Sequence, residues 1–211
     1  CWNLREIDVS HFDTSNMEWI GYMFANCRSL ESIDLSAFDI SKVAYLDGLF
    51  QNCARLKNII LPSSSTSNLL GMYVMFEGCS SLEYVDLSSF DTSNVTTMMD
   101  MFMNCHSLKS LDLSSFNTAS VPSYRRMFYG CSNLEHLNIS SFNPATISDA
   151  EYMFCNTQKL TTLDLGEFDL SQSNNEGAGH WLGELSKQCH IRCTPETKEA
   201  LIAASSLLSD S

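Results

Sequence analysis

The chain has 211 residues, of which 44% are hydrophobic and 18% charged, and its formal net charge is −13. This acidity argues against nucleic acid and anionic membrane surfaces as partners, because both bind clustered Lys and Arg. The sequence contains no apolar run of about 18 residues, the length that crosses a bilayer, so we also expect no direct membrane insertion by this fragment.

From the first residue onward, cysteine and leucine recur with a period of 26 residues. The cysteines of this repeat are Cys1, Cys27, Cys53, Cys79, Cys105 and Cys131, each followed three residues later by a leucine. A period in the twenties that carries L-x-x-L-x-L predicts an α/β fold, a right-handed leucine-rich repeat solenoid with one short strand and one short helix per coil. Because the chain opens on a repeat without a capping segment, we expect it to be a fragment.

Within one repeat unit, such as residues 79–104, the hydrophobic period changes. Leu82, Val85 and Leu87 alternate with polar residues, which is typical of a strand with one buried face. Three- and four-residue spacing then predicts a helix with an apolar face made by Val95, Met98, Met101, Phe102 and Cys105. Its start is predicted near the capping residues Asn16, Asn68, Asn94, Ser120 and Thr146. Its end is predicted at residues that tolerate left-handed backbone, namely Asn26, Asn52, Gly78, Asn104, Gly130 and Asn156.

Stacked coils place equivalent residues over one another, so the repeat also predicts columns of like side chains. The phenylalanine column comprises Phe24, Phe50, Phe76, Phe102, Phe128 and Phe154. A second phenylalanine column comprises Phe12, Phe38, Phe90, Phe116, Phe142 and Phe168. We interpret both columns as core, since one coil can bury its apolar face only against its neighbours.

The third coil departs from the pattern. Ile60 stands where most other coils carry Asp, Pro62 follows the strand, and Ser64 replaces the phenylalanine of the second column. The polar run 63–67 predicts an irregular loop and a gap in that column.

The repeat extends over only part of the chain, which divides it into two predicted segments. Residues 1–172 are predicted to form the leucine-rich repeat solenoid, with about seven coils, and residues 173–211 a C-terminal capping segment. Within the cap, 173–179 reads as a surface loop and 181–185 as a short turn. Residues 190–192 read as a strand and 194–208 as a terminal helix with an apolar face.

The cysteines and histidines give little support for chemistry. Inward cysteines one strand apart could form thiols or inter-coil disulfides, and we favour thiols because buried Cys behaves as a small hydrophobe. Cys189, His190 and Cys193 are too few for a closed zinc site. The histidines stand in different coils, and no hydrolase, metalloprotease or phosphate-loop motif occurs. We therefore expect a protein that is not an enzyme and has no metal or cofactor.

Outward strand positions form the predicted concave face, which is the usual binding surface of a solenoid. Its acidic column comprises Asp8, Asp34, Ile60, Asp86, Asp112, Asn138 and Asp164. Its flanking column comprises Glu6, Ser32, Asn58, Tyr84, Ser110, His136 and Thr162. Neighbouring like charges need compensation, for example from Ser hydroxyls or backbone amides. Three interpretations stay open: a solvated, hydrogen-bonded ladder, recognition of a basic or polar protein surface, and calcium binding.

The unit C-S-x-L-x-x-L-D-L-S-S-F-D-T-S-N-V-x-x-M-x-x-M-F, from Cys79 to Phe102 and with small changes from Cys105 to Phe128, resembles the repeat of BspA-like leucine-rich surface proteins. The resemblance covers about residues 1–172 and is weakest in coil three. It implies a bacterial protein at the cell surface or outside the cell that mediates adhesion, with host extracellular matrix or plasma proteins such as fibronectin and fibrinogen as partners. It transfers no binding residues.

Two hypotheses follow. In the first, the chain is a non-enzymatic, cell-surface or secreted adhesion module that binds a protein through the concave sheet. The predicted binding residues are Glu6, Asp8, Asp34, Tyr84, Asp86, Asp112, His136, Asn138 and Asp164. In the second, the chain is a structural spacer or stalk segment of a larger surface protein with no ligand of its own.

Overall fold

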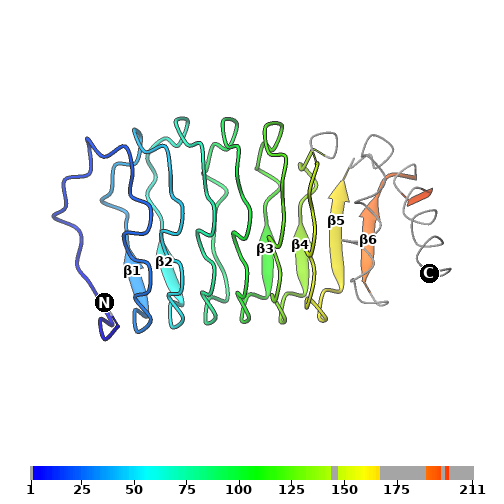
Figure 1. Ribbon diagram of the computed structural model, residues 1–211, viewed down its shortest axis with the longest axis horizontal. Coiled ribbons are helices and arrows are strands. Elements are labelled where there is room, and N and C mark those ends of the chain that lie inside the picture. The colour runs from blue at the N-terminus through cyan, green and yellow to red at the C-terminus, as the bar shows by residue number, and fades with distance from the viewer. Residues whose placement is uncertain (1, 144–146, 167–188, 196–197, 200–211) are drawn as a thin grey trace.

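The computed structural model describes residues 2–143, 147–166, 189–195 and 198–199. Successive coils lie side by side along the long axis in sequence order, which makes the chain a parallel-strand β-solenoid (Figure 1). Strands β1 (Ser32–Asp34) and β2 (Asn58–Ile60) form a parallel pair. A four-stranded parallel sheet comprises β3 (Ser110–Asp112), β4 (His136–Asn138), β5 (Thr162–Gly166) and β6 (His190–Cys193). The predicted repeat solenoid is therefore confirmed at this level.

Strand pairing follows the repeat. Leu111 of β3 pairs with Leu137 of β4, and Leu137 pairs with Leu163 of β5, so each residue meets its equivalent one coil away. These leucines are 0–3% exposed, while the residues on either side of each face outward. The two-residue period of a strand therefore puts one row of leucines in the core and leaves the polar columns on the sheet face.

The expected helix in each coil is wrong. Residues 22 and 26 have φ angles of 58° and 60°, and the same two left-handed positions recur in later coils, whereas an α-helix needs φ near −63° throughout. The hydrogen bonds also differ from those of a helix, because alternate amides donate to a carbonyl of the next coil. The N–H of Phe24 donates to the carbonyl of Leu49 at 3.1 Å, and the N–H of Cys27 donates to the carbonyl of Phe24 at 3.2 Å. Within the described ranges, helix is assigned only at residues 195, 198 and 199.

Stacked tight turns therefore replace the helices, and we call this side of the solenoid the turn face. The left-handed backbone predicted for Asn26, Asn52, Gly78, Asn104, Gly130 and Asn156 is confirmed, although each residue ends a turn instead of a helix. Along each turn, amides that donate to a carbonyl of the same turn alternate with amides that donate to a carbonyl of the next coil. Neighbouring coils therefore stabilise each other by hydrogen bonding as well as by packing.

The phenylalanine column is confirmed. Consecutive rings are stacked with centroids 5.5–5.9 Å apart, and no member is more than 3% exposed. In the second column, Phe38, Phe90, Phe116 and Phe142 are buried, whereas Phe12 is 47% exposed and Phe168 lies outside the described residues. The irregular loop of coil three is also found, and the Ser64 hydroxyl accepts a hydrogen bond from the Ile40 amide at 2.9 Å.

Among the described residues, five cysteines are buried and unbridged, Cys27 and four that we call the cysteine column: Cys53, Cys79, Cys105 and Cys131. Each cysteine of the column donates to the carbonyl of the phenylalanine 29 residues earlier, for example Cys53 Sγ to Phe24 O at 3.0 Å. Burial raises the pKa of Cys53 and of Cys131 to about 12. These cysteines therefore act as small core residues with a satisfied thiol, as the preferred interpretation predicted.

The predicted strand at 190–192 is confirmed as β6, which extends the sheet beyond β5. Its pairing with β5 joins Thr162 to His190, two residues beyond the repeat spacing. A terminal helix is seen only at its first described residues, where the Lys198 amide donates to the Thr194 carbonyl at 3.0 Å. The loop at 173–179, the turn at 181–185 and most of 194–208 lie outside the described residues, so the division into solenoid and cap stays a prediction.

Candidate functional site

The acidic column is held in place by local hydrogen bonds. The amide of Ser36 donates to Asp34 Oδ1 at 2.8 Å, and the same bond joins Ser88 to Asp86 at 2.9 Å. Bonds from the hydroxyl and amide of Ser36 hold the pKa of Asp34 below its usual value, and Ser88 has the same effect on the pKa of Asp86. The carboxylates are therefore ionised at neutral pH, and serine donors provide the expected compensation for their repulsion.

Coil three lacks both partners of this bond. Ile60 takes the place of the carboxylate, and Pro62, which has no N–H, takes the place of the serine amide. Because acceptor and donor are replaced together, neither is left unsatisfied. The replacement leaves an apolar side chain, 54% exposed, in the acidic column.

The sheet is open next to this coil. Residues 57–61 and 83–87 are all described, and no backbone hydrogen bond joins the two segments. On the turn face the same coils stay connected, since the Phe76 amide donates to the Met101 carbonyl at 2.9 Å. The strands of coils three and four are thus separated only at the sheet face.

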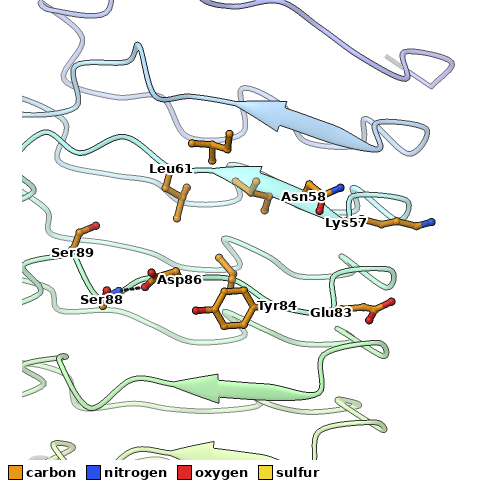
Figure 2. A pocket seen from close by; sticks show the side chains of 11 residues that line it. Lys57, Asn58, Leu61, Glu83, Tyr84, Asp86, Ser88 and Ser89 are labelled. Atoms are coloured by element: carbon orange, nitrogen blue, oxygen red, sulfur yellow. Dashed lines mark hydrogen bonds between the residues drawn. The ribbon is translucent and has the colours of Figure 1, made fainter.

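A cavity of about 790 Å³, which we call the notch, occupies this separation. Figure 2 shows Lys57, Asn58 and Leu61 on one wall and Glu83, Tyr84 and Asp86 on the other. The notch is lined by Lys57, Asn58, Ile59, Ile60, Leu61, Glu83, Tyr84, Val85, Asp86, Ser88 and Ser89. Its size falls within the range of ligand pockets.

The strand predicted at residues 82–88 is not formed. Burial alternates as expected, with Val85 6% and Leu87 1% exposed between outward residues. However, the segment has no ladder partner in coil three, and its described backbone contact with coil five is the bond from the Lys109 amide to the Glu83 carbonyl at 3.3 Å. A β-strand is defined by hydrogen-bonded pairing with a neighbour, so alternating burial alone was not enough to predict one here.

A smaller hollow of about 270 Å³, the trough, crosses β3 to β6. It is lined by Tyr84, Ser110, Leu111, Asp112, His136, Leu137, Asn138, Thr162, Asp164 and Arg192. Arg192 continues the acidic column into β6 and lies 3.2 Å from the Asp164 carboxylate. Tyr84 lines both the notch and the trough and is 61% exposed.

The structure divides the predicted binding residues into three groups. Tyr84 and Asp86 line the notch. Tyr84 also lines the trough, together with Asp112, His136, Asn138 and Asp164. Glu6, Asp8 and Asp34 lie on the same face but line neither hollow.

The predicted binding residues leave out several residues that line the two hollows, although Asn58 and Ile60 were already assigned to the concave face. Lys57, Asn58 and Ile60 line the notch, and Arg192 lines the trough. The break in the acidic column at Ile60 and the nearby Pro62 were the available signals for the notch. No repeat position predicted Arg192, because β6 lies outside the regular spacing.

A second exposed surface lies on the turn face of the first three coils. Trp19, Tyr22, Tyr45 and Tyr73 are 37–57% exposed there. The Tyr22 ring fills the space that a side chain at Gly48 would need. These aromatic residues line neither the notch nor the trough, so they offer matched control substitutions.

In the ranges that the structure describes, no group of three His, Cys, Asp or Glu side chains is arranged to hold a metal ion. Over the same residues, no helix has the length and apolar character needed to cross a membrane.

Comparison with known proteins gives a family match. The model of the family described as "Mycoplasma protein of unknown function, DUF285" matches residues 3–84 and 70–180. No curated protein sequence matches the chain. Among solved structures, the "Crystal structure of TLR13-ssRNA13 complex" aligns over 72% of this chain with 16% identity and a TM-score of 0.31. The alignment covers 27% of that neighbour's chain.

Proposed function

Since the chain belongs to the DUF285 family, whose description assigns no activity, we propose from its sheet face that it is a non-enzymatic protein-binding module. The resemblance of its repeat to BspA-like proteins supports the finer proposal, an adhesion module at the surface of a bacterial cell or secreted from it. Its partners would then be host extracellular matrix or plasma proteins.

The observation that carries the proposal is the position of Tyr84. It is a large aromatic side chain, 61% exposed, that lines both hollows on a face where small polar and acidic residues predominate. Tyrosine is enriched among the residues that dominate binding energy, and such residues lie centrally in an interface. Exposing it has no packing benefit for the monomer, whereas a partner would bury it.

The charge of the face indicates the chemistry of the partner. Asp86 and Asp112 have lowered pKa values because of serine hydrogen bonds, so both stay ionised at neutral pH. A basic or polar protein surface is complementary to them, and the net charge of −13 would accelerate its approach at low salt. Binding should therefore slow as ionic strength rises.

Surface-immobilised fibronectin and fibrinogen provide a direct test, with the purified chain in solution and biolayer interferometry as the readout. We expect saturable binding that Tyr84→Ala weakens by about 10-fold or more, the effect of losing a dominant contact. Asp86→Lys with Asp112→Lys should reduce the association rate. Tyr45→Ala on the turn face is the control and should bind like the parent. Unchanged affinity in the first two variants would place the site elsewhere.

A structural spacer is the second candidate. The observation that favours it is that each Asp of the acidic column already accepts a hydrogen bond from the backbone amide two residues later, so the recurrence of Asp has a structural cause. A spacer predicts no saturable binding to either immobilised protein at any ionic strength, and Tyr84→Ala would then change nothing.

A further inference from the structure

The notch lies between two strand segments of parallel direction whose facing backbone groups make no hydrogen bonds to one another. We propose that it accepts the main chain of an extended peptide segment of the partner, which adds as a strand between coils three and four. This inference rests on the proposed function and identifies the part of a protein partner that this face would hold.

The backbone of β2 supplies the first wall. The Asn58 amide donates to Glu31 O at 3.4 Å, and Ile60 O accepts from the Leu35 amide at 2.8 Å, so these two residues point toward coil two. In a strand, alternate residues point their N–H and C=O groups to opposite sides. Ile59 and Leu61 therefore direct theirs into the notch, where no backbone group of coil four meets them.

The second wall is the extended segment of coil four. The N–H and C=O groups of Tyr84 and Asp86 make no backbone hydrogen bond to either neighbouring coil in the described structure. Unpaired strand edges are templates for an added strand. A peptide main chain presents alternating donors and acceptors with a rise of about 3.3 Å per residue, which is the complement that two facing strand edges require.

Side chains at the notch specify which peptide would fit. Ile60 and Tyr84 are 54% and 61% exposed and offer apolar contact. Glu83 is paired with Lys109 at 2.6 Å, whereas Asp86 makes no ion pair with any described residue. We therefore assign to the bound segment an apolar side chain against Ile60 and Tyr84 and a Lys or Arg near Asp86.

The edge between coils four and five is also without a ladder, but there the acidic column carries Asp86 and Asp112 and offers no apolar anchor. Coils five to seven close the position. Between β3 and β4, and again between β4 and β5, the ladder pairs three consecutive residues, which leaves no edge for a third strand. The apolar replacement of the acidic column occurs at Ile60, beside the opening. The two features that a strand-binding site needs, free edges and an apolar anchor, therefore coincide at the notch.

The test uses a synthetic probe, the blocked peptide acetyl-Lys-Val-Lys-Val-Lys-Val-amide, titrated into the ¹⁵N-labelled full chain. We expect saturable shifts centred on the amides of Ile59, Leu61, Tyr84 and Asp86, with slower hydrogen exchange at the same amides. A peptide of the same sequence with N-methylated valines keeps the charges but loses main-chain donors, so it should bind at least about 10-fold more weakly. Asp86→Asn should weaken binding at low salt, and Tyr45→Ala should leave it unchanged.

Three results would overturn the inference: no saturable binding, equal binding of the N-methylated peptide, or shifts confined to the trough. These failures are distinct from failure of the proposed function. If the chain binds fibronectin or fibrinogen through Tyr84 while the peptide results are negative, the proposed function stands and strand addition is wrong. If the peptide binds the notch while neither immobilised protein binds, strand addition stands and the proposed matrix and plasma partners are wrong.

Discussion

Restoring the missing hydrogen bond of coil three tests the account of the acidic column quantitatively. The perturbation is Ile60→Asp combined with Pro62→Ser, which reintroduces the carboxylate and the amide found in other coils. In those coils the serine amides lie 2.8–2.9 Å from the Asp oxygens. We expect the two changes to be coupled, because either alone supplies only half of the bond.

The magnitude follows from comparable bonds. A side-chain oxygen that accepts from a nearby backbone amide contributes about 1 kcal/mol, with a range of about 0.5–2 kcal/mol, at helix N-termini. Replacing proline costs about 0.4–1 kcal/mol through the unfolded state, but that cost appears in the single variant as well and cancels in the cycle. We therefore expect a coupling free energy of about 1 kcal/mol between the two sites, with little net change in stability for the double variant.

The assay is a double-mutant cycle measured by urea unfolding, followed by circular dichroism at pH 7 and again at pH 2.5. Protonation of the new carboxylate at pH 2.5 should weaken the coupling. The reverse changes in a regular coil, Asp112→Ile with Ser114→Pro, form the matched control and should show coupling of the same sign and size. Additive single effects, within about 0.3–0.5 kcal/mol at pH 7, would refute the reasoning.

Four further outcomes are expected. Phe76→Ala should lower the free energy of unfolding by about 3–5 kcal/mol, and by roughly 0.5–1.5 kcal/mol more than Phe24→Ala, because Phe76 stacks on two described rings and Phe24 on one. Gly130→Ala should cost about 1–2 kcal/mol in urea unfolding, since φ is +73° and the new Cβ would lie 2.5 Å from Asn104 Oδ1; Gly130→Asn should cost less, because Asn tolerates left-handed backbone. The thiols of the cysteine column should resist iodoacetamide at pH 8 until the chain unfolds, as measured by mass spectrometry, because burial raises their pKa; labelling of the folded chain at the unfolded rate would contradict their burial. The lowered pKa values of the acidic column contribute stability that is fully present above the unfolded value of 3.8 and is lost as pH falls through the folded values, so the urea midpoint should drop below about pH 4; a midpoint that rises on acidification would contradict this.

The sequence alone predicted the features that arise when equivalent residues of successive coils stack over one another. A constant 26-residue period determines which residues lie over one another, so the phenylalanine column and the left-handed Asn and Gly positions follow directly. It did not distinguish a helix from stacked turns, because Met98, Met101 and Cys105 face the core in either arrangement. The deciding feature, an amide such as that of Phe24 bonded to the next coil, is a relation between coils that one repeat does not contain.

The notch is a second feature that the repeat pattern did not predict. Coil four keeps the repeat residues and was the template for the predicted strand, yet it is unpaired, while coil three carries the unusual Ile60 and Pro62 and still forms β2. Coil four is without a ladder toward coil three and toward coil five, and its own residues give no sign of this.

A periodic surface also poses a problem for specific binding, because equivalent coils present equivalent contacts and a partner could slide from one to the next. A single preferred site requires a break in the period. On this sheet face the break occurs at Ile60, where the acidic column carries an apolar side chain, and at Tyr84, the tyrosine of the flanking column. Both residues line the notch, where the ladder is also interrupted. The irregular coil is therefore the part of the solenoid that can hold one partner in one register, and the regular coils on either side fix its geometry.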